Sequence, residues 1–329
     1  MRIEAFSEAK NPRAPEANED ALLILPGRAY AAIDGVSDRD GTRYEGVLAG
    51  RFASTLVRRR LEEMLGGRQE WTPRGVVDEL TAAIDAAYGR FGVRARVRTD
   101  WSGKIATTLA LALVDDAAVR IVLVGDSGVR INCGEIVRED KDIDRITALL
   151  RRAAWRAVKA RSDDPAVWET VSRQVAFHGA GQDAASVAPW LNAVDLAGIA
   201  EVANAECRAA LPGLPAAAIG NVVARGIVGG QGGHQNNADS PLGYSCLDGF
   251  AIPDRFIRYL TLPRAEVRSI ELFTDGYFRP GDGFGVAEWE AAFHAAEAED
   301  AAKVAVYLSP RGSVGGNWAD DRSYLGVML

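Results

Sequence analysis

Cysteine is scarce in this chain of 329 residues, which has only Cys133, Cys207 and Cys246. Their spacing gives neither a C-x-x-C pair nor an even set for disulfide bonds, as expected for a protein from a reducing compartment. The residue six positions after each cysteine is never arginine. The Cys-x5-Arg pattern that cysteine-dependent phosphatases need is therefore absent.

The sequence also lacks a long apolar run. No stretch approaches the roughly 18 consecutive apolar residues of a transmembrane helix, and residues 1–6 lack the apolar core of a signal peptide. Excess positive charge is missing too, because the net charge is −7. Arg58, Arg59 and Arg60 lie on a predicted helix, where we expect them to form a solvent-exposed face. We therefore expect a cytoplasmic protein that binds neither membranes nor nucleic acid.

The composition is that of an ordinary globular protein, 48% hydrophobic and 25% charged. The length allows two domains or one enlarged domain. Residues 21–25 and 29–34 predict a β-hairpin with its turn at Gly27, after a short strand at residues 3–7. Helices are predicted at residues 46–65, at 72–91, where Thr72 and Pro73 supply a start signal, and at 286–298.

Runs rich in β-branched residues predict the other strands, at residues 107–114, 119–125, 129–133, 244–247, 256–262, 269–274 and 323–329. The first three of them are expected to form an antiparallel meander. Strands follow one another without a helix between each pair, which favours antiparallel sheets over a strand–helix alternation.

Acidic residues lie beside five of these strands. Three strands end at an acid, namely Asp34, Asp126 and Asp275, and two acidic pairs precede strands, Glu19-Asp20 and Asp320-Asp321. Carboxylates that converge on one point repel each other by roughly 4 kcal/mol per close pair at an effective dielectric constant of about 20. The pattern therefore predicts a divalent cation at the strand ends.

Oxygen ligands of this kind favour Mg²⁺ or Mn²⁺ over zinc, because hard cations take carboxylate, carbonyl and water oxygens. Histidine is too sparse to change this choice. His178, His234 and His294 are scattered along the sequence and predict no ligand set. His234, in a glycine-rich stretch, is the one candidate for a flap residue that touches substrate.

The order of these motifs resembles that of the metal-dependent phosphatases of the protein phosphatase 2C family, in its bacterial form. The motifs are Asn18-Glu19-Asp20, Asp34-Gly35, Gly125-Asp126-Ser127, Asp275-Gly276 and Asp320-Asp321. The resemblance covers residues 1–139 and 240–329. It implies an α+β fold, a four-layer αββα sandwich of two antiparallel β-sheets flanked by helices.

The resemblance also implies roles for single residues. Asp34 would bridge two metal ions, the carbonyl of Gly35 would bind the second, and Glu19 would reach that ion through water. Asp275 would be a further ligand of the first ion, and Asp126 would hold a weaker third ion.

The last carboxylate and the phosphate-binding cation are less well defined. Asp320 aligns best with the third carboxylate ligand, but the family has Asp-Asn where this chain has Asp-Asp, so Asp321 stays open. The family places an arginine shortly before its first acidic motif. Arg13 is the nearest candidate, although it stands six residues before Glu19, and a solvated loop arginine is the other interpretation.

Together the motifs predict a Mn²⁺- or Mg²⁺-dependent serine/threonine protein phosphatase in which a metal-bridging water attacks phosphorus. Its partners would be a phosphorylated protein substrate and a serine/threonine kinase system. Two alternatives stay open. One is a catalytically silent relative that binds a partner as a scaffold, and the other is a phosphatase for a small phosphorylated metabolite.

A competing motif is present at residues 38–42, which spell the D-x-D-G-T nucleophile sequence of haloacid dehalogenase-like hydrolases. That motif needs an apolar strand directly before its first aspartate. Here the preceding residues 34–37 already form a turn, and position 130 is arginine where that family needs a second acid. This interpretation is therefore disfavoured.

Residues 140–237 differ in character from the rest. They are alanine-rich and helical, and they include a glycine cluster at residues 229–233. We expect a single catalytic domain over residues 1–329 with an enlarged helical insertion, or flap, at about 140–237. Since all five acidic motifs lie outside it, we expect this insertion to govern substrate choice rather than the chemistry.

Overall fold

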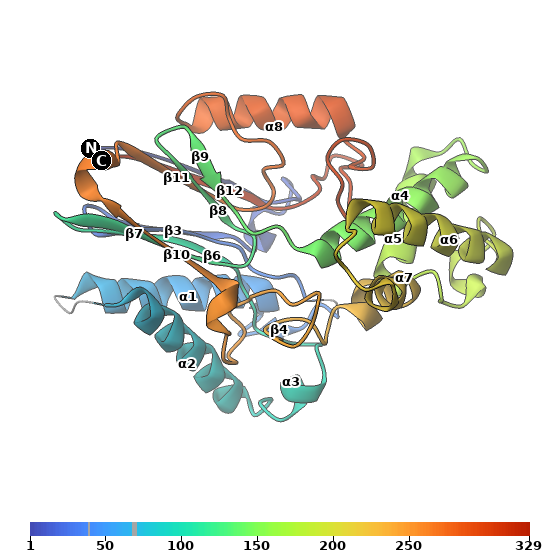
Figure 1. Ribbon diagram of the computed structural model, residues 1–329, viewed down its shortest axis with the longest axis horizontal. Coiled ribbons are helices and arrows are strands. Elements are labelled where there is room, and N and C mark those ends of the chain that lie inside the picture. Colours follow the sequence, from blue (N-terminus) through green and yellow to red (C-terminus); the bar gives the residue numbers. More distant parts are fainter. Residues whose placement is uncertain (39, 68–70) are drawn as a thin grey trace. The chain divides into compact units, whose positions relative to one another are not determined.

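The computed structural model describes residues 1–38, 40–67 and 71–329. Arg39, in the D-x-D-G-T sequence, lies outside the described residues. The chain forms two compact units (Figure 1): the first contains Met1–Asp140, Tyr244–His294 and Asp320–Leu329, and the second contains Lys141–Gly243 and Ala295–Ala319. None of the helices in these ranges is long and apolar enough to cross a membrane.

The first unit is built on two five-stranded antiparallel sheets. One has the order β10-β7-β6-β3-β2, with bounds Ile257–Pro263, Ala118–Val124, Leu109–Val114, Ala29–Ile33 and Ala21–Leu25. The other has the order β1-β12-β11-β8-β9, with bounds Arg2–Glu8, Arg322–Met328, Ser269–Phe273, Gly128–Ile131 and Glu135–Val137. A small hairpin of β4 (Arg43–Tyr44) and β5 (Val47–Leu48) stands apart from them.

Alternating side chains on the strands create two hydrophobic layers. In β3, Tyr30 and Ala32 join residues of both sheets in one buried cluster, whereas Ala29, Ala31 and Ile33 join a second cluster with the helices. The period of two along a strand explains this division, because successive side chains point to opposite faces. The sheets therefore pack face to face as a sandwich with apolar residues on both sides of β3.

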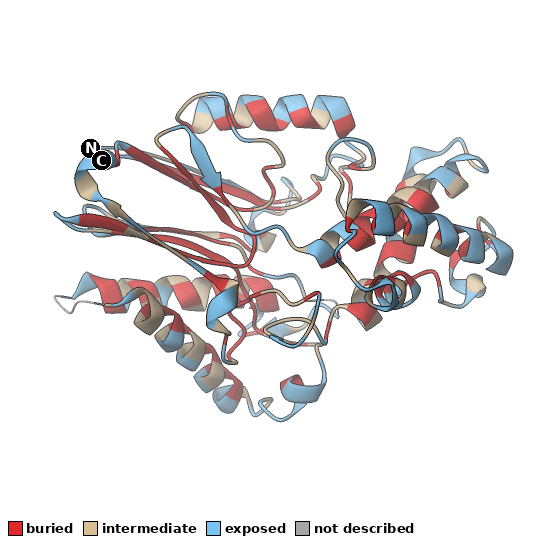
Figure 2. Ribbon diagram, in the orientation of Figure 1, coloured by how far each residue is buried: buried red, intermediate tan, exposed pale blue. Residues whose placement is uncertain are grey.

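Helices cover the outer faces of this sandwich. α1 (Ala49–Gly66) and α2 (Pro73–Phe91) pack on the sheet that contains β3, and the short α3 (Arg96–Thr99) follows them. α8 (Val286–Asp300) packs on the other sheet, where Trp289 contacts Phe273 and Tyr324. Figure 2 shows exposed residues on the side of α8 that faces away from the sheet. The predicted αββα sandwich is confirmed.

Several local predictions are also confirmed. β2 and β3 form the expected hairpin, with Ala21 paired to Ile33. α2 begins where its signals indicate, because the side chain of Thr72 accepts a hydrogen bond from the backbone N–H of Gly75 at 3.1 Å. It ends before Gly92, whose φ of 67° lies in the left-handed region.

Two strand predictions are wrong. β8 does not continue a meander from β7 but belongs to the other sheet, because β10 already pairs with the free side of β7. Residues 244–247 form no strand, and Leu247 makes an isolated bridge to Thr107. Their local β preference is outweighed by the tertiary position of this segment.

The second unit is helical. It contains α4 (Asp142–Lys159), α5 (Pro165–His178), α6 (Ala193–Ala210) and α7 (Ala216–Gly230), and α4 packs against the other three. α6 begins with a reciprocal capping box of Asn192 and Asp195. α7 is kinked at Gly226, whose φ is 59°. The segment Ala295–Ala319, which the sequence did not associate with these helices, belongs to the same unit.

A buried arginine explains why that segment is included. Arg151 on α4 forms an ion pair with Glu169 on α5 and donates hydrogen bonds to the carbonyls of Ala302 at 2.8 Å and Ser309 at 3.1 Å. Glu169 also accepts a hydrogen bond from the backbone N–H of Gly312. Both charged side chains are buried, so this network joins two helices to the later segment.

We predict that Arg151→Met lowers the free energy of unfolding by about 3–5 kcal/mol, because it leaves the Glu169 carboxylate buried without its cation. Urea denaturation of the full chain measures this loss. The matched control is Arg156→Met on the same helix. The Arg156 side chain is 60% exposed and pairs with Glu206, so its loss should cost at most about 1 kcal/mol. Equal effects of the two substitutions would contradict the prediction.

Candidate metal centre

Acidic residues from both sheets meet at one edge of the sandwich. In one sheet Asp34 directly follows β3, Asp126 comes two residues after β7, and Glu19 comes two residues before β2. In the other sheet Asp275 comes two residues after β11, and Asp320 comes two residues before β12. We refer to these five residues as the acidic centre. Antiparallel pairing produces this arrangement, because the end of one strand lies beside the start of its neighbour.

Three of these side chains form a compact group. One carboxylate oxygen from each of Asp34, Asp126 and Asp275 lies within 4.8 Å of the other two. Burial raises the pKa of Asp34 well above its ordinary value, and the neighbouring charges of Asp275 and Asp20 raise it further. The group thus carries the charge repulsion expected from the sequence, in a geometry that one divalent cation would relieve.

The end of β3 is held firmly in place. The carbonyl of Asp34 accepts hydrogen bonds from the backbone N–H of Thr108 at 2.8 Å and from the hydroxyl of Thr107 at 2.6 Å. Gly35 is buried, and a Cβ atom there would overlap the carbonyl of Gly50 and lie 2.6 Å from that of Glu19. Close backbone approach therefore requires glycine at the position expected to offer a carbonyl ligand.

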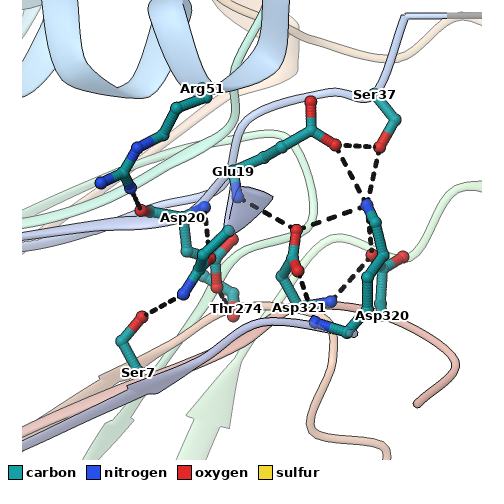
Figure 3. A network of polar contacts seen from close by, with 10 residues as sticks. Ser7, Glu19, Asp20, Ser37, Arg51, Thr274, Asp320 and Asp321 are labelled. Carbon is teal, nitrogen blue, oxygen red and sulfur yellow. Dashed lines mark hydrogen bonds and ion pairs between the residues drawn. The ribbon is translucent and has the colours of Figure 1, made fainter. Parts of the chain in front are cut away.

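Glu19 lies beside this glycine with its two carboxylate oxygens in different environments (Figure 3). Oε2 accepts hydrogen bonds from the ammonium of Lys10 at 3.0 Å and from the hydroxyl of Ser37. Oε1 is buried and has no hydrogen-bond partner among the described residues. A buried carboxylate oxygen without a partner is costly, and a cation would satisfy it. The donor set thus fits a divalent ion.

Asp320 and Asp321 differ in their surroundings. Asp321 is buried, and its carboxylate accepts hydrogen bonds from the backbone N–H groups of Lys10 at 2.6 Å and Glu19 at 3.1 Å. The side chain of Asp320 is 25% exposed, and it contributes to the raised pKa of Asp34. The geometry therefore favours Asp321 as a bracing residue and Asp320 as the residue available to a metal ion.

Asp20 is a member of the site that sequence reasoning did not assign a role. It is buried, and its carboxylate accepts a hydrogen bond from the hydroxyl of Thr274 at 2.8 Å. Burial first, and the charge of Asp321 second, raise its pKa to about 7. Its other carboxylate oxygen has no hydrogen-bond partner among the described residues. The buried acids at this edge therefore include Asp20 in addition to the acidic centre.

Among the described residues, Lys10 rather than the predicted Arg13 forms ion pairs with these acids. The ammonium of Lys10 lies 3.0 Å from Glu19, 3.3 Å from Asp321 and 3.6 Å from Asp320. Arg13 is exposed, and the contact described for it is a backbone hydrogen bond to Asn11. Spacing could not distinguish the two, because both lie in one proline-containing loop before Glu19 and no periodic element fixes their direction.

His234, the candidate flap residue, lies in the second unit. Its Nδ1 atom is 2.6 Å from the hydroxyl of Ser240, and burial lowers its pKa. Contact of His234 with a substrate stays a prediction.

Comparisons with known proteins find solved structures of low similarity. No protein-family model and no curated protein matches the sequence. A search of solved structures finds the serine/threonine phosphatase PstP/Ppp of Mycobacterium tuberculosis, with 16% identity and a TM-score of 0.45 over 100% of this chain and 98% of that chain. The phosphatase Stp1 of Staphylococcus aureus has 13% identity and a TM-score of 0.43 over 100% of this chain and 95% of that chain.

A third structure is PppA, described as a regulatory component of T6SS in Pseudomonas aeruginosa, with 13% identity and a TM-score of 0.42 over 100% of this chain and 97% of that chain. At such low identities and TM-scores the likeness assigns no activity to this chain. The αββα sandwich itself is the fold that the sequence predicted. Any activity has to be argued from the geometry of the acidic centre.

We predict that the metal-free protein loses stability as the pH rises from about 4 to about 7. The pKa of Asp20 is 3.8 in its ordinary state and about 7 in the fold, so the folded protein holds an extra proton between these values. The free energy of unfolding must then fall with rising pH in that range. Urea denaturation in chelator at several pH values between 4 and 8 measures the slope.

Asp20→Asn should make this slope shallower, because asparagine does not titrate, while Asp34, whose pKa is also raised, still contributes to it. Asp282→Asn provides the control, since the Asp282 side chain is 83% exposed and lies in a surface loop. A slope that is the same in wild type and Asp20→Asn would show that Asp20 is not the titrating group.

Proposed function

We propose that this protein is a metal-dependent phosphatase that hydrolyses phosphoserine and phosphothreonine esters in proteins. The observation that carries the proposal is the group of Asp34, Asp126 and Asp275, which come from three strand ends in two sheets and bring their oxygens within 4.8 Å. Structural aspartates are usually neutralised by neighbouring donors, whereas burial first and the surrounding acids second raise the pKa of Asp34. Such an arrangement is typical of metal-dependent hydrolysis.

The chain offers ligands for more than one Mn²⁺ or Mg²⁺ ion. Asp34, Asp126 and Asp275 would hold one ion, and Glu19, Asp320 and the carbonyl of Gly35 are the donors on the side of a second. When bound, two divalent ions supply Lewis acidity toward the phosphoryl oxygen and lower the pKa of a coordinated water. This interpretation places Asp126 with the first ion, rather than at a separate third one.

The protein itself contributes position and charge. The hydrogen bonds of Thr107 and Thr108 to the carbonyl of Asp34 keep the ligand from relaxing away from its neighbours. Asp321 fixes the backbone of Lys10 and Glu19 in the same way. The ammonium of Lys10 is ion-paired with the acids, so we assign to Lys10 the contact with the phosphate oxygens that the resemblance placed on Arg13.

One observation favours the scaffold alternative. The ammonium of Lys10 neutralises part of the acidic centre, as a catalytically silent relative would require. Hydrolysis of p-nitrophenyl phosphate with Mn²⁺, followed by phosphopeptides, separates the three candidates. No turnover of either would favour the scaffold, and turnover of small phosphate esters without phosphopeptides would favour a metabolite phosphatase.

We predict that Asp34→Asn and Asp275→Asn each reduce kcat on p-nitrophenyl phosphate by at least about 1,000-fold, because each removes a charged ligand from the compact group. The fold should survive, since the substitutions also relieve repulsion, and a thermal melt in chelator checks this. Asp282→Asn, on an exposed side chain, should retain wild-type activity. A folded Asp34→Asn protein with activity within about tenfold of wild type would refute the proposal.

A further inference from the structure

Lys10 stands at the position where a second divalent cation would find its ligands. Its ammonium contacts three carboxylates, those of Glu19, Asp320 and Asp321, and lies 2.9 Å from the hydroxyl of Ser37. An ammonium is a compact point charge on a flexible stem, so among amino-acid side chains it is a close substitute for a small metal ion.

The backbone and the side chain of Lys10 are held differently. The backbone N–H is anchored by the hydrogen bond to Asp321 at 2.6 Å. The side chain is 26% exposed, so the ammonium has a path to solvent that does not require the backbone to move. Lys10 can therefore leave the carboxylates while remaining attached beside them.

The ammonium of Lys10 and a second divalent ion would both use the carboxylates of Glu19 and Asp320. The Oε2 atom of Glu19 accepts hydrogen bonds from Lys10 and Ser37, and Oδ1 of Asp320 lies 3.6 Å from the same ammonium. A divalent ion that takes these oxygens must displace the ammonium, because two cations cannot occupy one set of ligands without strong repulsion.

We propose that Lys10 is a tethered counter-cation that competes with the second divalent ion. It neutralises Glu19, Asp320 and Asp321 when metal is scarce and withdraws when the second ion binds. The affinity for that ion is thus reduced by the free energy of displacing the lysine. The inference rests on the proposed metal centre. It adds that Lys10 raises the metal concentration at which the second position becomes occupied.

The test is calorimetric titration of Mn²⁺ into the full-length wild-type protein, Lys10→Met, Lys10→Arg and Arg13→Met. Methionine retains most of the aliphatic stem and removes the charge. Lys10→Met should bind the weaker Mn²⁺ ion at least tenfold more tightly than wild type. Lys10→Arg keeps a cation and should bind this ion no more tightly than wild type does. Arg13→Met is the matched control, because Arg13 is an exposed basic residue of the same loop, and it should change nothing.

A thermal melt in chelator gives a second readout without metal or activity. Lys10→Met should lower the melting temperature by several degrees because three carboxylates lose their counter-cation, whereas Arg13→Met should not. Saturating Mn²⁺ should then raise the melting temperature of Lys10→Met by more than that of wild type, because binding to the folded state adds to its stability.

Three results would overturn the inference. Equal Mn²⁺ affinities for wild type and Lys10→Met would show that the lysine does not compete. Tighter binding in both Lys10→Met and Lys10→Arg would show that the effect depends on shape and not on charge. If Mn²⁺ binds to neither wild type nor Lys10→Met, the proposed metal centre fails as well, whereas the first two results leave the metal centre and the phosphatase proposal intact.

Discussion

Repulsion between carboxylates at one edge of the β-sandwich is the constraint on which the rest of the site depends. The acids cannot move apart, because each follows or precedes a strand whose register is fixed by its neighbours. Three things can reduce the repulsion: a proton, as the pKa of Asp20 near 7 indicates, the ammonium of Lys10, or a divalent ion. The pH and the metal concentration decide which of them prevails.

Close backbone packing is what allows this concentration of charge. Gly35 and Gly50 face each other so closely that a side chain on either would collide with the other segment or with Glu19. The start of α1 consequently reaches the edge where Glu19 is buried. Removing water in this way raises the cost of each unpaired oxygen, and it also strengthens the attraction for any cation that enters. The same geometry therefore destabilises the empty site and stabilises the filled one.

Much of the fold could be predicted because local signals and tertiary position agree. The β2–β3 hairpin and α2 have turn and cap residues that match their surroundings. The five acids could be located for the same reason, since each lies within two residues of a strand end. The crossing of β8 to the second sheet could not be predicted, because it depends on β10 pairing with β7 from more than a hundred residues away in sequence.

Lys10 escaped prediction for a related reason. It lies in an irregular loop, so its position is set by hydrogen bonds to Asp321, a residue near the other end of the chain. The inclusion of Ala295–Ala319 in the helical unit has a similar origin, since it depends on the carbonyl groups that Arg151 contacts. Backbone carbonyl and N–H groups are present at every position and leave no signal in the sequence.

The first unit contains two kinds of ion pair: buried arginine pairs that are permanent, and a lysine pair that can exchange with another cation. Arg130 and Arg322 are buried and form bidentate pairs with Glu271 and Glu290 under α8. Each planar guanidinium group forms this two-point pair with one carboxylate, and Arg322 also pairs with Glu8 at 2.7 Å. Such pairs are costly to break. Lys10 is partly exposed, shares its charge among several carboxylates and fits none of them in two-point geometry. The free energy needed to separate Lys10 from its carboxylates is therefore lower than that needed to separate either arginine from its partner, because water can replace each single contact of the ammonium. A cation held in that manner is suited to give way to a divalent ion.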